Sequence, residues 1–390
     1  MQKTLEVTRS LVLADVKDLA SAEPPCITIT IPVQPAPNPS RVDAMRLKSA
    51  VRQAEDTLER DWTECSPGLR KELSSSLHTF FNEADEIGGE GGSLVVLRSP
   101  DVFRAFQVKP LLDEAVVISN HFGVFPFLGA LQVAEEKFYI LALSQNNVRL
   151  LRCTPDSSEQ VDLGPNTPVS LEEWLNTRLP NSAPDHGTVR DAPEGSTGGS
   201  FTSTHDRDNK DEHIYNFFRV IDRAVFDLLR GQKYPVVLCG VEYERTMYKG
   251  LSQYEHVMSE GVQGSPESLK GGEMHGRALE VVQEFFAQPA KKALALWERM
   301  GGTDRVSTRL PDVVKAAFEG RVAHLFAAEG AQTMGVFDRT TMQMAASGRH
   351  EDLVSAAALQ TIAHGGDVFI LSPADMPGGQ EITMAAVLRY

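Results

Sequence analysis

Cysteine is scarce in this 390-residue sequence, and its four cysteines lie far apart. No Cys-x-x-Cys pair occurs among Cys26, Cys65, Cys153 and Cys239, whereas a structural zinc site needs ligands clustered at short spacing. A disulfide framework needs many cysteines in a short secreted chain. We therefore predict buried, reduced thiols, with neither a zinc site nor a disulfide scaffold.

The sequence also lacks a long apolar run. Its longest runs, such as Phe138 to Leu143 and Pro235 to Cys239, are far shorter than the roughly 20 residues of a membrane-spanning helix. The first ten residues, MQKTLEVTRS, contain no apolar stretch of the kind found in signal peptides. We expect a soluble, non-secreted, cytoplasmic protein whose apolar runs form buried strands.

Basic residues are too few to balance the acidic ones. Lys and Arg together number 38 against 53 Asp and Glu, which gives a formal net charge of −15. Such a chain is repelled by a phosphate backbone at long range, and this argues against a general nucleic-acid coat protein. The net charge does not decide whether the protein docks on a shaped RNA–protein surface through local basic faces.

The motifs of nucleotide binding and of serine hydrolases are missing. The glycine-rich stretches at 88–92 and 271–272 lack the Gly-Lys-Ser/Thr ending of a phosphate loop and the spacing of a dinucleotide fingerprint. No Gly-x-Ser-x-Gly elbow occurs either. We find no catalytic constellation from the residues alone and expect no cofactor.

One stretch, from about 180 to 212, is rich in Gly, Ser, Thr, Asp and His and holds almost no apolar residue. A loop of that length within a compact domain is usually functional or disordered. Its histidines His186, His205 and His213 lie among several aspartates, which raises the question of a metal site. Because no pair has helical i, i+4 placement in a defined element, we favour solvated loop charge over metal binding.

Alternating strand and helix patterns predict three consecutive α/β segments, 1–129, 130–301 and 302–390. The predicted strands are 27–33, 94–97, 102–108 and 115–119, then 137–144, 148–153 and 234–241, then 322–327, 334–337, 341–345, 368–371 and 382–388. Predicted helices lie around 47–58, 69–84, 171–176, 214–229, 273–300, 311–320 and 352–364. Pro289 should kink or divide the longest of them.

Several stretches resemble the bacterial relatives of the archaeo-eukaryotic release factors and Pelota. The sequences EGRVAHLF at 319–326 and DLVSAAALQTIAHGGDVFIL at 352–371 are similar to the C-terminal domain of that family. FYILALS at 138–144 with VRLLR at 148–152 resembles its middle-domain hairpin, and HIYNFFRV at 213–220 resembles the helix after its catalytic loop. The resemblance implies a ribonuclease-H-like middle domain. It also implies a C-terminal α/β/α domain like the archaeal kink-turn-binding ribosomal protein.

In release factors of this family, a Gly-Gly-Gln loop between the hairpin part and the long helix of the middle domain places water at the peptidyl-tRNA ester. The matching place here reads STGGSF at 196–201, with Gly198 and Gly199 present and Ser200 where glutamine would stand. Paired glycines permit backbone conformations closed to other residues, but serine is shorter than glutamine and offers a different donor and acceptor set. The tripeptide Gly378-Gly379-Gln380, before a terminal strand, is interpreted instead as a hairpin turn.

Three hypotheses follow. The first is a non-catalytic factor that binds the tRNA entry site of the ribosome during hibernation or stress. Gly198, Gly199 and Ser200 would then lie near the peptidyl-transferase centre. The second is a rescue enzyme that hydrolyses peptidyl-tRNA, and the third is a protein-binding adaptor with no ribosomal role. For the first, a monomer is expected to contact ribosomal RNA and proteins and a translational GTPase such as elongation factor Tu. The candidate binding residues are His205, Arg207, Lys210 and Arg219.

Overall fold

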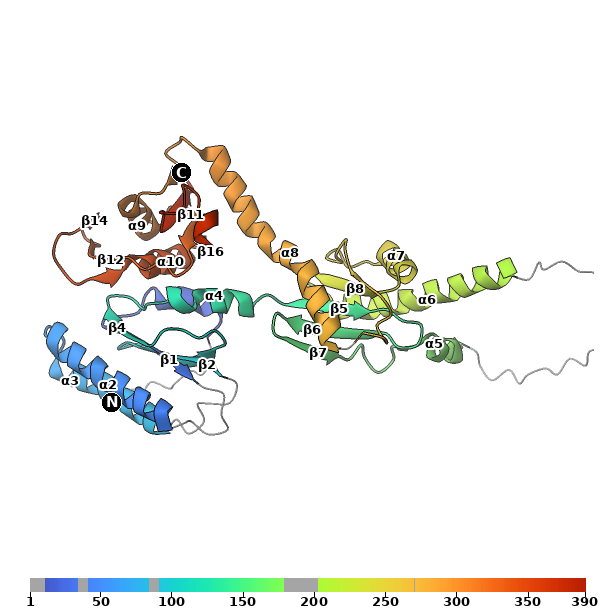
Figure 1. Cartoon of the computed structure of the whole chain (residues 1–390), viewed down its shortest axis with the longest axis horizontal. Helices are drawn as coiled ribbons and strands as arrows, with labels where there is room; N and C mark the ends of the chain where they lie inside the picture. The colour runs from blue at the N-terminus through green and yellow to red at the C-terminus, as the bar shows by residue number, and fades with distance from the viewer. Residues whose placement is uncertain (1–10, 34–40, 84–90, 179–202, 270) are drawn as a thin grey trace, which may run out of the picture. The chain divides into compact units, whose positions relative to one another are not determined.

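The computed structural model describes residues 11–33, 41–83, 91–178, 203–269 and 271–390, without the side chains of 41–44, 82–83, 178, 203–209 and 271. The chain forms two compact units (Figure 1). The terminal unit combines Met1–Glu135 with Pro289–Tyr390, and the middle unit is Glu136–Gln288. Each predicted segment contains its own sheet, so the α/β class is confirmed. The exact segment boundaries stay a prediction.

The first sheet of the terminal unit is antiparallel, in the order β3-β2-β1-β4. Ile27, Ile29 and Ile31 on β1 are fully buried against helices α2 and α3 because the strand alternates and these helices present an apolar stripe. The predicted strands and both helices are confirmed. Their bounds are β1 Cys26–Val33, β2 Gly92–Arg98, β3 Phe103–Val108, β4 Ala115–Ser119, α2 Arg41–Asp61 and α3 Pro67–Glu83.

The second sheet of this unit has the order β10-β17-β11-β16, with β11 and β16 parallel. Helices α9 and α10 bury one face of the sheet, and the end of α8 from Ala293 to Met300 buries the other, giving an α/β/α arrangement. The bounds are β10 Val306–Ser307, α9 Leu310–Phe318, β11 Val322–Ala328, α10 Leu353–Ala363, β16 Asp367–Leu371 and β17 Met384–Leu388. Two short ladders join β12 Met334–Gly335 to β15 Glu351–Asp352 and β13 Phe337–Asp338 to β14 Gln343–Met344.

The tripeptide at Gly378-Gly379-Gln380 lies in the connection from β16 to β17. The N–H of Gly379 donates to the carbonyl of Met376 at 3.1 Å, and Gly378 and Gly379 have φ of 94° and 114°, which favours glycine. The interpretation as a turn is therefore confirmed. The hairpin is wrong, because β11 lies between β16 and β17 and those two strands do not pair.

The middle unit has a five-stranded sheet in the order β7-β6-β5-β8-β9. The predicted hairpin is confirmed as β5 and β6, and β8 and β9 run parallel to β5, in agreement with the ribonuclease-H-like fold that the resemblance implies. Helices α6 and α7 pack on one face and the first half of α8 on the other. The bounds are β5 Phe138–Ala142, β6 Arg149–Thr154, β7 Ser157–Val161, α5 Leu171–Arg178, α6 Ser203–Leu229, β8 Val236–Gly240, α7 Glu242–Leu251, β9 Val262–Gln263 and α8 Gly271–Met300.

Three further expectations need correction. The loop predicted at 180–212 ends earlier, because α6 begins at Ser203, and residues 179–202 lie outside the described part of the chain. Pro289 does not divide α8, which is continuous from Gly271 to Met300, whereas the predicted kink stays a prediction. Of the four free thiols, Cys65 is half-buried, whereas the other three are buried as predicted. No helix of the described residues is long and apolar enough to cross a membrane.

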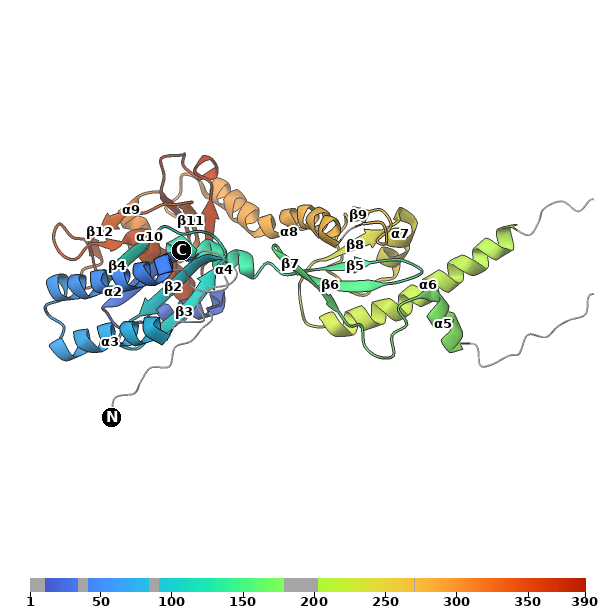
Figure 2. The ribbon, with the colours of Figure 1, turned by 60° about the horizontal axis from the view of Figure 1, so that its bottom comes forward.

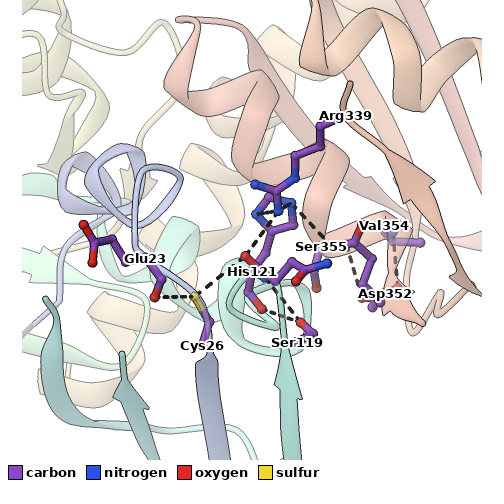
Figure 3. A network of polar contacts seen from close by, with 10 residues as sticks. Glu23, Cys26, Ser119, His121, Arg339, Asp352, Val354 and Ser355 are labelled. Atoms are coloured by element: carbon purple, nitrogen blue, oxygen red, sulfur yellow. Dashed lines mark hydrogen bonds and ion pairs between the residues drawn. The ribbon is translucent and has the colours of Figure 1, made fainter. Parts of the chain in front are cut away.

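Within the terminal unit, helix α4 (Phe125–Ala134) lies in one apolar core with α9 and α10 and joins the first sheet to the second. A polar network that is buried at His121 and Glu351 and exposed at Arg339 runs alongside it (Figure 3). Arg339 Nη2 donates to His121 Nε2 at 2.7 Å, and the N–H of Phe125 donates to Ser355 Oγ at 3.1 Å. Glu351, 1% exposed, places Oε2 3.6 Å from His121 Nε2. The two ends of the chain are thus held together by hydrogen bonds as well as by apolar packing.

Candidate functional site

A polar pocket lies at one edge of the middle sheet. The parallel strands β5 and β8 end at Ala142 and Gly240, and the carboxyl ends of parallel strands are the usual place for ligand sites in open α/β sheets. Helix α7 begins there, directly after β8. The pocket has a volume of about 260 Å³ and is lined by Leu143, Ser144, Gln145, Asn146, Val241, Glu244, Ser265, Pro266 and Glu267.

Two carboxylates in this pocket are held by neighbouring side chains. Gln145 Nε2 donates to Glu244 Oε1 at 2.9 Å, and Ser144 Oγ donates to Glu267 Oε1 at 2.7 Å. Arg149 Nη2 donates to the carbonyl of Pro266 at 3.2 Å and so fixes the segment that carries Glu267. The pocket therefore presents preorganised acceptors from two segments that are distant in sequence, held by donors from a third.

Burial sets the protonation of Glu244. This side chain is 5% exposed, and burial raises the pKa of its carboxyl, with a smaller rise from the negative charge of Glu267. The hydrogen bond from Gln145 and the positive charge of Lys210 act in the opposite direction and lower that pKa. Nearby, burial and the hydrogen bond to Asp211 raise the pKa of Tyr243 to about 12. The pocket is thus coupled to the start of α6.

The helices that flank residues 179–202 pack together beside this pocket, and both Figure 1 and Figure 2 show α5 next to α6. The rings of Trp174 on α5 and His213 on α6 have centroids 6.1 Å apart. The N–H of Leu171 donates to the carbonyl of Gln145 at 2.8 Å, and Ser170 Oγ accepts the N–H of Glu173 at 3.1 Å as an N-cap. Helix α5 is therefore tied to the pocket through the tip of the β5–β6 hairpin.

The predicted loop residues Gly198, Gly199 and Ser200 lie outside the described residues. His205 and Arg207 lie in the first turns of α6, and their side chains are outside the description too.

The two remaining predicted residues, Lys210 and Arg219, are both exposed on α6. At about 100° per residue, their nine-residue separation places them on opposite sides of the helix. Lys210 is near enough to Glu244 to affect its pKa, whereas Arg219 belongs to a different face. They do not form one cluster, and their role in binding stays a prediction.

The residues that form the pocket were not predicted from the sequence. A signal existed for Glu244, because it follows directly after the buried strand at 236–240, where site residues of α/β proteins often lie. Ser144, Gln145 and Glu267 gave no such signal, since only the fold brings them together.

The chemistry of the pocket is that of binding. Its hydroxyl–carboxylate pair, Ser144 and Glu267, has no histidine or cysteine among the lining residues to complete a nucleophile and base arrangement. Within the described residues no group of three or more His, Cys, Asp or Glu side chains is placed to hold a metal ion. Fixed carboxylate acceptors suit a donor group such as an amine or guanidinium.

Replacing Gln145 by Ala should lower the free energy of unfolding of the middle unit by about 1–2 kcal/mol, because a buried carboxylate then loses its donor. The pKa of Glu244 should rise further, so the variant should lose stability more steeply as the pH rises above the pKa of an unfolded glutamate. Urea unfolding at several pH values measures both effects. Gln253→Ala, at an exposed position, is the control. Equal losses in the two variants would contradict a special role for Gln145.

A comparison with known families finds a match for the middle of the chain. Residues 137–321 match the model of bacterial archaeo-eukaryotic release factor family 3. The predicted resemblance is thereby confirmed for this stretch, which includes the pocket, α5, α6 and α7. No curated protein sequence matches the chain.

Solved structures give weaker similarities. Pelota of Archaeoglobus fulgidus is 11% identical over 99% of this chain and 94% of its own, with a TM-score of 0.32. Dom34 of S. cerevisiae, described as a translation termination-like factor, is 12% identical over 80% and 76%, with a TM-score of 0.35. The archaeal translation termination factor aRF1 is 13% identical over 97% and 99%, with a TM-score of 0.22. Scores this low do not establish a shared arrangement of the whole chain.

Proposed function

Because residues 137–321 match a release-factor family, we propose that this protein is a ribosome-associated translation factor that occupies the site admitting tRNA without hydrolysing peptidyl-tRNA. The single observation that carries the non-catalytic part is Ser200, which follows Gly198 and Gly199 where the family's release factors have glutamine. Orientation of a water molecule depends on the reach of the group that holds it. A serine hydroxyl is about two bonds shorter than the glutamine amide, so water at the ester would lose its partner.

The pocket at the edge of the middle sheet supports the same reading. Among its lining residues, carboxylates are engaged by Gln145 and Ser144, and neither carboxylate is paired with a histidine. Catalysis by a general base would also need the attacking water to be held within hydrogen-bond reach of that base. The pocket and the two helices α5 and α6 instead provide a rigid base for a binding loop.

The finer parts of the proposal concern timing and partners. We place the factor on idle or stressed ribosomes, where a non-hydrolysing occupant of the tRNA site does not compete with active translation. The resemblance of residues 302–390 to the C-terminal domain of release factors supports contact between this segment and a translational GTPase such as elongation factor Tu.

Sedimentation of the tagged protein from growing and starved cells tests the proposal. We expect co-migration with ribosomes in the starved sample, weakened at high salt because contacts with RNA release counterions. Stalled ribosomes that carry a labelled peptide should show no release above background when the protein is added. Release that Gly199→Pro abolishes would identify a rescue enzyme instead. Migration at the top of the gradient in both states would overturn a ribosomal role and favour an adaptor.

A further inference from the structure

One side of α6 carries a row of arginines. Arg219 and Arg223 lie about 40° apart around the helix at 100° per residue, and Arg230 follows directly after the helix ends at Leu229; all three are exposed. Tyr215, 43% exposed, continues the same side about 40° from Arg219. We call Tyr215, Arg219, Arg223 and Arg230 the arginine face. Such alignment makes a continuous basic strip on a chain whose net charge is −15.

The arginines of this face have no carboxylate partner among the described residues. Exposed arginines elsewhere in the middle unit are paired, Arg152 with Glu159 at 2.7 Å and Arg277 with Glu273 at 2.6 Å. No ion pair or hydrogen bond of that kind links Arg219, Arg223 or Arg230 to another described residue. Their guanidinium groups therefore keep their full donor capacity for a ligand.

Neighbouring helices of the middle unit leave the arginine face uncovered. Helix α5 meets α6 at His213, about 120° around the helix from Arg219, and α7 meets it at Asp222, about 60° to the other side. The carboxylates closest to the row on α6 are Glu212, a turn before Tyr215, and Asp227, about 40° beyond Arg223. Glu212 lies in line with the row at its N-terminal end, and Asp227 lies at its side.

We propose that the arginine face binds the phosphate backbone of RNA. Arginine suits this partner because its planar guanidinium forms paired hydrogen bonds with phosphate oxygens and stays charged. A row along one helix matches the regular repeat of charge along a nucleic-acid strand. Tyr215 adds an exposed aromatic ring, the residue type on which unpaired RNA bases stack. The inference rests on the proposed function in so far as the ribosome supplies the RNA.

Charge reversal tests this surface. The full-length variant Arg219→Glu with Arg223→Glu is compared with Lys48→Glu with Arg52→Glu on α2, a pair with the same four-residue spacing, exposure and charge change. Binding is measured to purified ribosomes and to a labelled RNA hairpin with an unpaired loop, over a range of salt concentrations. Circular dichroism confirms that each variant is folded.

We expect the α6 variant to bind both probes at least about tenfold more weakly, and its slope of log affinity against log salt to fall by about 1.5–2, from two lost phosphate contacts. The α2 variant should stay within about threefold of the unchanged protein. Equal losses in both variants, or no binding of the hairpin by the unchanged protein, would overturn the inference. Loss of ribosome binding alone would point to an acidic protein partner and also overturn it.

The outcomes separate this inference from the proposed function. If the unchanged protein binds ribosomes and the α6 variant binds them equally well, the proposed function stands and the arginine face is not its RNA contact. If the unchanged protein ignores ribosomes but binds the hairpin through α6, the RNA surface stands and the ribosomal role fails.

Discussion

Replacing Asp222 by Ala should lower the free energy of unfolding of the middle unit by about 3–5 kcal/mol. Asp222 is 1% exposed and accepts three hydrogen bonds, from Tyr248 Oη at 3.1 Å, Ser252 Oγ at 2.7 Å and the Gln253 N–H at 3.0 Å. Alanine would leave these donors without their acceptor, and the hydroxyl of Tyr248 is fully buried. The carboxylate thereby fixes the end of α7 against α6.

Urea unfolding, with amide hydrogen exchange to assign the transition to the middle unit, measures this loss. Asp227→Ala on the exposed side of the same helix is the matched control and should change stability by less than about 0.5 kcal/mol. Tyr248→Phe removes one donor and should cost about 1 kcal/mol. A loss at Asp222 no larger than at Asp227 would mean that water replaces the carboxylate and that α7 is held by its apolar contacts.

The parts of the fold that the sequence predicted are those with clear periodicity. The β5–β6 hairpin was predictable because two apolar strands flank the polar tip at 145–147, and α2 because Leu47, Val51, Ala54 and Leu58 recur at helical spacing. Helix α4 was missed since FPFLGALQVA is apolar nearly throughout and shows no stripe, which reflects burial on several sides. Helix α7 was missed for the opposite reason: its buried positions include the charged Glu244.

Contacts between distant residues explain why the sites were less predictable. Gln145 and Glu244 meet only because β5 and β8 are neighbours, and His121 and Arg339 are 218 residues apart. Side chains of this kind carry no local pattern. The arginine face, by contrast, follows from helical spacing once α6 is known to run from Ser203 to Leu229, and only Arg219 of its members had been predicted.

The buried network of the terminal unit should give this protein an unusual dependence of stability on pH. Arginine can only donate, so His121 Nε2 must accept the 2.7 Å hydrogen bond from Arg339 with its lone pair, and the imidazole is neutral. Burial, with repulsion from Arg339, lowers the pKa of His121 to about 3. Burial raises the pKa of Glu351 to about 7, a rise that attraction to Arg339 moderates and the charge of Asp352 increases.

These two shifts have opposite effects between pH 4.5 and 6.5, the ordinary pKa values of glutamate and histidine. There the folded state keeps a proton on Glu351 that the unfolded state has lost, so stability falls as the pH rises. His121 is neutral when folded but protonated when unfolded, so stability rises with pH over the same range. Each effect amounts to about 1.4 kcal/mol per pH unit at most, and together they nearly cancel.

Single substitutions should therefore reveal slopes that the unchanged protein hides. Glu351→Gln leaves the histidine, and the free energy of unfolding of the terminal unit should increase by about 2–3 kcal/mol from pH 4.5 to 6.5. His121→Asn leaves the glutamate, and stability should decrease by a similar amount up to about pH 7. The double variant should again be nearly flat. Chemical unfolding across this range measures all four proteins against each other.

Opposite signs for the two single variants are the decisive outcome, because general effects of substitution shift a stability curve without reversing its slope. Glu55→Gln, which removes the carboxylate 2.9 Å from the exposed His78, is the matched control and should leave the slope nearly unchanged. Parallel curves for Glu351→Gln and His121→Asn would show that water or a bound ion solvates Glu351, whose two oxygens have no partner among the described residues. In that case hydrogen bonds such as that from Phe125 to Ser355 and apolar packing would still join the two ends of the chain, without a pH-dependent contribution from Glu351.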